Sequence, residues 1–162
     1  ANETVVADAA IPDSLQTPIH PTLVGKRMLV VDHDTATRDE AHQLLEPYGL
    51  IVETAHTGCE ALTMMRNMDR ENPYDCILSE ERLQDMDACE LLKAMQGIFG
   101  VSSPPLVLMK RAGFYDPVHV MSRAREAGLR KDARIVKPLR LEQAVAMVER
   151  MIDENGPQDM CS

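Results

Sequence analysis

The sequence is poor in aromatic residues and contains no long apolar run. It has no Trp, three Tyr and two Phe among 162 residues. No apolar stretch approaches the ~20 residues that a membrane-spanning helix needs. The first residues also lack the basic, apolar and cleavage regions of a signal peptide. We therefore expect a soluble, cytoplasmic domain.

Basic residues are in deficit as well. The chain has 17 Lys and Arg against 26 Asp and Glu, which gives a formal net charge of −9. Such a charge repels a phosphate backbone, and no Lys/Arg stripe interleaved with aromatic residues offers a local exception. Direct binding of nucleic acid is therefore not expected.

Metal-binding patterns are missing too. The four cysteines, Cys59, Cys76, Cys89 and Cys161, form no CxxC pair and have no metal-ligand spacing, so we interpret them as reduced thiols. His33 has no second His or Cys at a spacing that suits zinc. We predict no metal site and no cofactor.

The composition indicates one globular domain with tails. Residues are 44% hydrophobic and 27% charged, an ordinary globular balance. Residues 1–24 carry three prolines and no sustained period, and we interpret them as a linker. The domain is predicted over residues 25–153 and a polar tail over residues 154–162.

Five short apolar runs recur at even spacing within that domain. They cover residues 28–31, 50–53, 76–78, 106–109 and 133–136, and each is followed by a stretch with helical period. Strands separated by helices pair in parallel through right-handed crossovers. The pattern predicts an α/β fold, a doubly wound five-stranded parallel sheet with helices on both faces. The first helix is predicted to be capped by Asp34 or Thr35 and to end at Gly49.

Charged residues gather where the predicted strands end. In doubly wound sheets the functional crevice lies outside the carboxyl ends of the strands. The residues at these ends are Asp32, His33 and Asp34, then Glu80 and Glu81, then Lys110 and Arg111, and finally Lys137 before Pro138.

The order and spacing of these residues resemble the receiver domains of response regulators. The stretches that carry the resemblance are GKRMLVVDHDTATR, YGLIVETAHTGCEAL, PYDCILSEERLQDMDACELLKAM, PPLVLMK and RIVKPLR. The resemblance implies a flavodoxin-like strand order of 2-1-3-4-5. It also implies an acidic pair and a phosphoacceptor Asp that bind magnesium, with a Thr or Ser and a Lys that hold the phosphoryl oxygens. The lead-in LVGKRMLVVD and the run DTATR further resemble receivers attached to hybrid histidine kinases.

The sequence departs from the family pattern at most of these positions. Asp32 matches the first acid, but His33 occupies the place of the second, and magnesium prefers oxygen ligands. Asp34 comes one residue later, where its side chain is better placed to cap the following helix. Glu80 stands at the phosphoacceptor position, and its extra methylene displaces the carboxylate by ~1 Å, enough to slow an in-line phosphoryl transfer severely.

The switch positions are altered too. Lys110 stands where the family has Thr or Ser, and Arg134 stands where it has Tyr or Phe, three residues before the retained Lys137. We predict that Glu80 pairs with Lys137 and also with Lys110. These fixed ion pairs would replace the contacts to metal and phosphoryl group.

The sequence therefore predicts a degenerate receiver, a pseudo-receiver that signals by protein contact and is not an enzyme. The family implies a contact face made by the fourth helix, the fifth strand and the fifth helix. The expected partner is a histidine kinase or another domain of the parent chain, and homodimers are possible.

Two other classes stay open. One is a working receiver in a phosphorelay, which would use magnesium with Asp34 and Glu80 in place of the usual carboxylates. The other is a small-ligand domain such as a flavin binder, although no Gly-rich phosphate loop follows the first strand.

Overall fold

The computed structural model describes residues 23–111, 113, 119–130 and 132–154. Its strands are β1 (Arg27–Val31), β2 (Ile51–Ala55), β3 (Cys76–Glu80), β4 (Leu106–Arg111) and β5 (Arg134–Lys137). Its α-helices are α2 (Thr35–Leu45), α3 (Gly58–Asn67), α4 (Ala88–Phe99), α5 (Val120–Glu126) and α6 (Leu141–Glu154). Two short 3-10 helices, η2 (Glu46–Tyr48) and η3 (Gly100–Ser102), follow α2 and α4.

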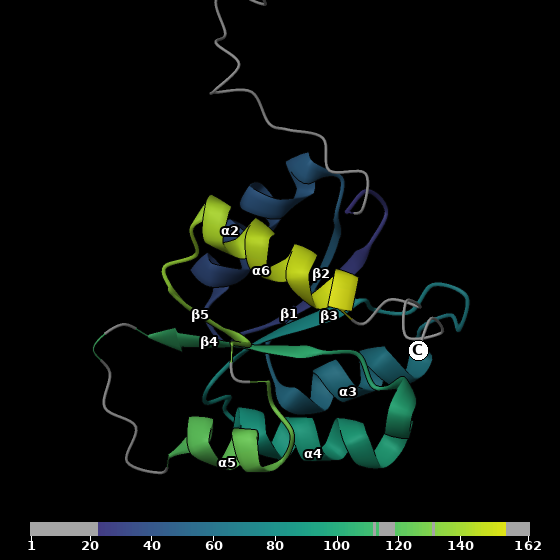
Figure 1. Cartoon of the computed structure of the whole chain (residues 1–162), viewed down its shortest axis with the longest axis vertical. Coiled ribbons are helices and arrows are strands. Elements are labelled where there is room, and N and C mark those ends of the chain that lie inside the picture. The colour runs from purple at the N-terminus through teal and green to yellow at the C-terminus, as the bar shows by residue number, and fades with distance from the viewer. Residues whose placement is uncertain (1–22, 112, 114–118, 131, 155–162) are drawn as a thin grey trace, which may run out of the picture.

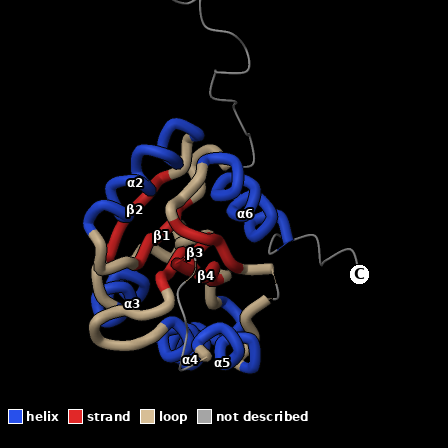
Figure 2. The backbone as a smooth tube through the Cα atoms, turned by 90° about the vertical axis from the view of Figure 1, so that its left-hand side faces the viewer, coloured by secondary structure: helices blue, strands red, loops and turns tan. Residues whose placement is uncertain are grey.

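The strands form one parallel sheet between two layers of helices. The strand order is β2-β1-β3-β4-β5. Helices α2 and α6 cover one face, and α3, α4 and α5 cover the other, as both views show (Figure 1 and Figure 2). The predicted doubly wound α/β fold is confirmed. Because the chain winds outward in both directions from β1, the switch point lies beyond the carboxyl ends of β1 and β3.

The core lies on both faces of the central strands. All five residues of β3 are buried, as a central parallel strand with helices on both sides requires. Met28, Met65, Met95 and Met109 are at most 1% exposed, which places these unbranched side chains in the gaps of the core.

Three strands extend further than the apolar runs predicted. Strand β3 continues to Glu80, β4 to Arg111 and β5 to Lys137. Glu80, Lys110, Arg111 and Lys137, which were predicted to follow these strands, are therefore within them, whereas Glu81 follows β3 as predicted. Pairing with neighbouring strands, such as Glu80 with Met109, satisfies the backbone there although the side chains are polar.

The first helix ends earlier than predicted. Asp34 caps α2 by accepting a hydrogen bond from the Ala36 N–H at 3.1 Å, as expected for this residue type. The α-helix stops at Leu45, because Pro47 lacks the N–H that the next helical hydrogen bond needs. The 3-10 helix η2 then continues the chain to Gly49, whose φ of 92° closes the turn.

The predicted boundaries of the domain can be compared only with the described residues. Leu23, which the prediction assigned to the linker, is fully buried in the core. The rest of the predicted linker, nearly all of the predicted tail, and Cys161 lie outside the described residues. Cys59, Cys76 and Cys89 are free thiols. No helix in the described part of the chain is long and apolar enough to cross a membrane.

Candidate functional site

Four predicted site residues meet at the carboxyl edge of the sheet, and we call them the rim cluster: Asp32, His33, Glu80 and Lys137. Asp32 and His33 directly follow β1, whereas Glu80 and Lys137 are the last residues of β3 and β5. The pairing of Val31 with Ser79 places residue 32 beside residue 80. Asp32 is fully buried and Glu80 is 6% exposed, so both carboxylates need partners within the protein.

Lys137 supplies the partner of Asp32. Its Nζ lies 2.6 Å from Asp32 Oδ2 and 3.8 Å from Glu80 Oε1. The other oxygen of Asp32, Oδ1, accepts a hydrogen bond from the Asp34 N–H at 2.8 Å. Both carboxylate oxygens of Asp32 thus have a partner. Lys137 was predicted to pair with Glu80, but its ammonium group lies closer to Asp32.

His33 supplies the partner of Glu80, a contact that the sequence did not predict. Glu80 Oε2 accepts the backbone N–H of His33 at 2.5 Å and lies 2.6 Å from His33 Nδ1, which donates when it carries the ring proton. Burial raises the pKa of Glu80, and the two contacts with His33 offset only part of that shift. The signal that could have revealed the contact is the parallel pairing of β1 with β3, which brings residues 32 and 33 to the end of β3.

The predicted pair of Lys110 with Glu80 is wrong. Lys110 Nζ lies 3.8 Å from Glu81 Oε2 instead. Side chains alternate between the two faces of a sheet, and Glu80 is in register with Met109. Lys110 therefore points to the opposite face from Glu80, toward Glu81.

Arg134 and Asp34 lie outside the rim cluster. Arg134 is exposed on β5, and its register with Leu108 places it on the same sheet face as Lys110. Asp34 caps α2 and does not join the group of possible metal ligands. The structure thus brings together Asp32, His33, Glu80 and Lys137 of the predicted site residues.

The rim cluster does not fit magnesium, the ion that the receiver family implies. In the described residues, one group of three possible ligands is close enough for a metal ion: Asp32, His33 and Glu80, with ligand atoms within 4.8 Å of one another. An imidazole replaces one of the oxygen ligands that magnesium prefers. In addition, the ammonium group of Lys137 lies within hydrogen-bond distance of Asp32, so an incoming cation would meet an existing positive charge.

The loop after β3 is anchored by Asp85, which sequence reasoning missed. Its Oδ1 accepts the Gly58 N–H at 2.9 Å and its Oδ2 accepts the Cys59 N–H at 2.8 Å. These two N–H groups belong to the first turn of α3 and have no partner within the helix. Burial raises the pKa of Asp85, but backbone hydrogen bonds, first those from Cys59 and Gly58 and then those from Asp85 itself and Met86, outweigh this effect and leave the pKa below its ordinary value.

Comparisons with known proteins agree with the fold. The family model for the response regulator receiver domain matches residues 28–149. The chain is 32% identical over 133 residues to the response regulator MprA of Mycobacterium avium, covering 82% of this chain and 54% of that protein. The MprA of Mycobacterium tuberculosis is likewise 32% identical over 133 residues, with 53% of its length covered. A crystal structure of a CheY-like receiver domain protein from Methanospirillum hungatei superposes with a TM-score of 0.67 at 28% identity, covering 80% of this chain and 95% of that one.

The chain belongs to the response regulator receiver domain family. It is a receiver domain of two-component signalling, and receiver domains are generally non-enzymatic signal transducers that interact with histidine kinases or other proteins. The chain spans about half the length of the curated relatives it matches.

Proposed function

We propose that this chain is a pseudo-receiver, a receiver domain that signals through protein contacts without aspartyl phosphorylation or magnesium. The observation that supports the proposal most strongly is that Glu80, the residue at the phosphoacceptor position, is buried and hydrogen-bonded. Glu80 is 6% exposed, and its Oε2 is held by both the backbone N–H and the ring of His33. A carboxylate oxygen already engaged in this way is poorly placed for in-line attack on phosphorus.

The electrostatics support the same proposal. Phosphoryl transfer depends on cations that neutralise charge developing on the transferred group. In the rim cluster, the positive charge of Lys137 is already committed to Asp32 at 2.6 Å. The cluster thus contains its own counter-charge, and neither a cofactor nor enzymatic activity is part of the proposed function.

The contact face that we propose is made by α5, β5 and α6. Helix α5 and strand β5 carry four basic residues and one acidic residue, whereas α6 carries four acidic residues and one basic residue. Val136 on the edge strand β5 is 44% exposed and lies next to the exposed Arg134 in the strand's outward row. A face with an exposed apolar side chain and separate basic and acidic parts favours a protein partner with a complementary charge pattern.

We propose as partners a histidine kinase or other domains of the parent chain, as in a hybrid histidine kinase. A homodimer through the same face is a further form of the proposal. The proposed setting is the cytoplasm, and no contact with nucleic acid or membrane is part of the function.

Exposure to acetyl phosphate with magnesium, followed by intact-mass spectrometry, tests the loss of phosphorylation. We expect no phosphoryl adduct on the natural chain. The matched control is the variant with His33→Asp, Glu80→Asp and Lys110→Thr, which restores the family's residue types and should gain a magnesium-dependent adduct. An adduct on the natural chain mapped to Glu80 would contradict the proposal and favour the working phosphoacceptor receiver.

A further inference from the structure

A groove lies between the carboxyl-terminal ends of α3 and α4, at the edge of the sheet opposite the rim cluster. Its volume is about 740 Å³. The two helices pack side by side on one face of the sheet (Figure 1). Five apolar side chains form most of its lining: Met65, Met68, Pro73, Ile98 and Phe99. The groove is large enough to take several side chains of another molecule.

The apolar surface extends beyond the groove. Ile98 is 39% exposed, and Val101 in the adjoining η3 is fully exposed. These are two of the five exposed large hydrophobic residues in the described part of the chain. Single exposed apolar residues are common on proteins, but a lined groove with an apolar extension is typical of an interaction site.

Two arginines flank this apolar surface. Arg66 and Arg70 line the groove and are exposed. Among the described residues, neither guanidinium has a hydrogen-bond or ion-pair partner. Other arginines of the same domain are paired with carboxylates, for example Arg123 with Asp87 and Arg150 with Asp132. In a chain with 26 acidic residues, the two groove arginines are available to carboxylates from outside.

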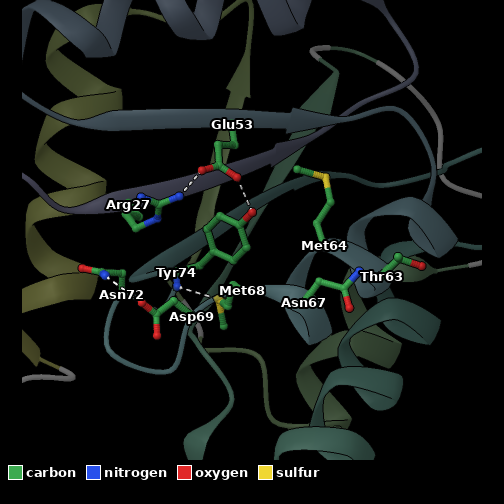
Figure 3. A pocket seen from close by; sticks show the side chains of 9 residues that line it. All are labelled: Arg27, Glu53, Thr63, Met64, Asn67, Met68, Asp69, Asn72 and Tyr74. Carbon is green, nitrogen blue, oxygen red and sulfur yellow. Dashed lines mark hydrogen bonds and ion pairs between the residues drawn. The ribbon is translucent and has the colours of Figure 1, made fainter.

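The neighbouring cavity shows the contrasting case. It has a volume of about 350 Å³ and shares Met68 with the groove. There the Arg27 guanidinium is paired with Glu53, and the Tyr74 hydroxyl donates to Glu53 at 2.5 Å, so both charged groups already have a partner although the buried Arg27 Nε has none (Figure 3). The Tyr74 N–H donates to Met68 Sδ at 3.1 Å and holds that side chain between the two cavities. This cavity therefore has less to offer a charged ligand than the groove has.

We propose that the α3/α4 groove docks an acidic segment of a partner protein that carries apolar side chains. The apolar side chains of the segment would fill the space over Met65 and Ile98, and its carboxylates would pair with Arg66 and Arg70. Grooves that take amphipathic segments combine an apolar floor with charged rims in this way. The inference goes beyond the proposed function, because it concerns the opposite edge of the sheet and does not depend on the chemistry of Glu80.

Methyl NMR of the full chain, labelled at the methionine methyl groups, tests the proposal. The probe is a synthetic amphipathic peptide of Leu, Ala and Glu, and the matched peptide carries Lys in place of Glu. We expect the acidic peptide to shift the methyl signals of Met65 and Met68, while Met28 and Met109 stay in place. The double variant Arg66→Glu with Arg70→Glu should weaken binding by ~10-fold or more, because repulsion replaces attraction. The double variant Arg82→Glu with Lys93→Glu makes the same charge change at exposed residues that do not line the groove and should leave the affinity within ~2-fold.

Several results would overturn the proposal. If the Lys peptide bound as tightly as the acidic peptide, the arginines would have no role in binding. If only methionines outside the groove shifted, the peptide would bind at another site. Tighter binding of decanoate than of the acidic peptide would assign the groove to a small amphiphile. Shifts of Met68 that depend on protein concentration without peptide would assign it to a second copy of this chain. Magnesium binding at Glu80 would contradict the proposed function and leave this test unaffected.

Discussion

At the residue scale, the two buried carboxylates of the rim cluster have their partners within the chain itself. The resemblance to receivers implies a magnesium ion and a phosphoryl group at this edge, whereas the structure shows Lys137 in contact with Asp32 and His33 in contact with Glu80. Buried carboxylates without partners are costly, and under the proposed function these groups of the chain compensate for the absence of a metal ion. The compensation explains how the fold can keep two buried acidic residues without an ion.

Replacement of Lys137 by Met tests this compensation. Asp32 is fully buried, and Lys137→Met would leave its carboxylate without the ammonium group at 2.6 Å. We expect the free energy of unfolding to fall by ~3 to 5 kcal/mol, measured by urea denaturation at neutral pH. Lys93→Met is the control, because Lys93 is exposed on α4 and its replacement should cost under ~1 kcal/mol. Equal small losses in the two variants would mean that Asp32 is not held by Lys137.

Asp85 makes the stability of the domain depend on pH in the acidic range. Its folded pKa lies below the ordinary value, because backbone hydrogen bonds, first those from Cys59 and Gly58, outweigh the effect of burial. The carboxylate therefore contributes stability above its unfolded pKa of ~3.9, and this contribution is lost as the pH falls through the lower folded pKa. In thermal melts, Asp85→Asn should lower the melting temperature at pH ~6, and the deficit should shrink toward pH ~3.

The control for that series is Asp39→Asn, an exposed residue on α2. The melting temperature of the Asp39→Asn variant should equal that of the natural chain at every pH. A deficit for Asp85→Asn that stays constant as the pH falls would show that the lost interaction does not depend on ionisation.

The residue scale also shows what the sequence could predict of the site. Asp32, Glu80 and Lys137 could be located from the order of the strands, because each ends or follows a strand on the same edge. The partners of Glu80 and Lys110 could not be located. The predicted strands ended at Leu78 and Met109, two residues before β3 and β4 end in the structure. Because Glu80 and Lys110 were not assigned to strands, the alternation of side chains could not be used to predict which face of the sheet each side chain is on.

At the element scale, capping fixes where the helices near the site begin. Asp87 and Glu90 form a capping box at the start of α4: Asp87 Oδ1 accepts the Glu90 N–H at 2.8 Å and Glu90 Oε1 accepts the Asp87 N–H at 2.9 Å. Arg123 of α5 also donates to Asp87 Oδ2 at 2.9 Å. One carboxylate thus starts α4 and ties it to α5.

The variant Asp87→Ala should lower the free energy of unfolding by ~1 to 2 kcal/mol, through the lost cap and the lost contact with Arg123. Arg123→Ala removes the contact alone and should cost less than Asp87→Ala, because the cap remains. Denaturation of both variants in urea measures the difference. Equal losses would show that the capping box adds nothing beyond the tie between α4 and α5.

The elements themselves were largely predictable from sequence. The alternation of apolar runs with helical periods predicted every strand of the sheet and its parallel pairing. The ends of the elements were less predictable, because they depend on pairing with neighbours. Glu80 and Lys137 continue their strands although they are charged, and Pro47 divides the predicted first helix into α2 and η2.

At the scale of the whole molecule, the two edges of the sheet differ in kind. The carboxyl edge carries the rim cluster, in which charges are paired internally, whereas the opposite edge carries the groove with Arg66 and Arg70. Helix α5 and strand β5, with four basic residues and one acidic residue, add a third region in a chain whose net charge is −9. Under the proposed function, partners bind at these surfaces without a phosphorylation event at the rim cluster.

The most direct test of the central proposal is an amide NMR titration of the full chain with magnesium and beryllofluoride. Because Lys137 and His33 already occupy the carboxylates of Asp32 and Glu80, the account predicts no shifts at these four residues beyond those caused by added salt. Saturable, magnesium-dependent shifts at Glu80 and Lys110 would contradict it and show a functional phosphoacceptor site.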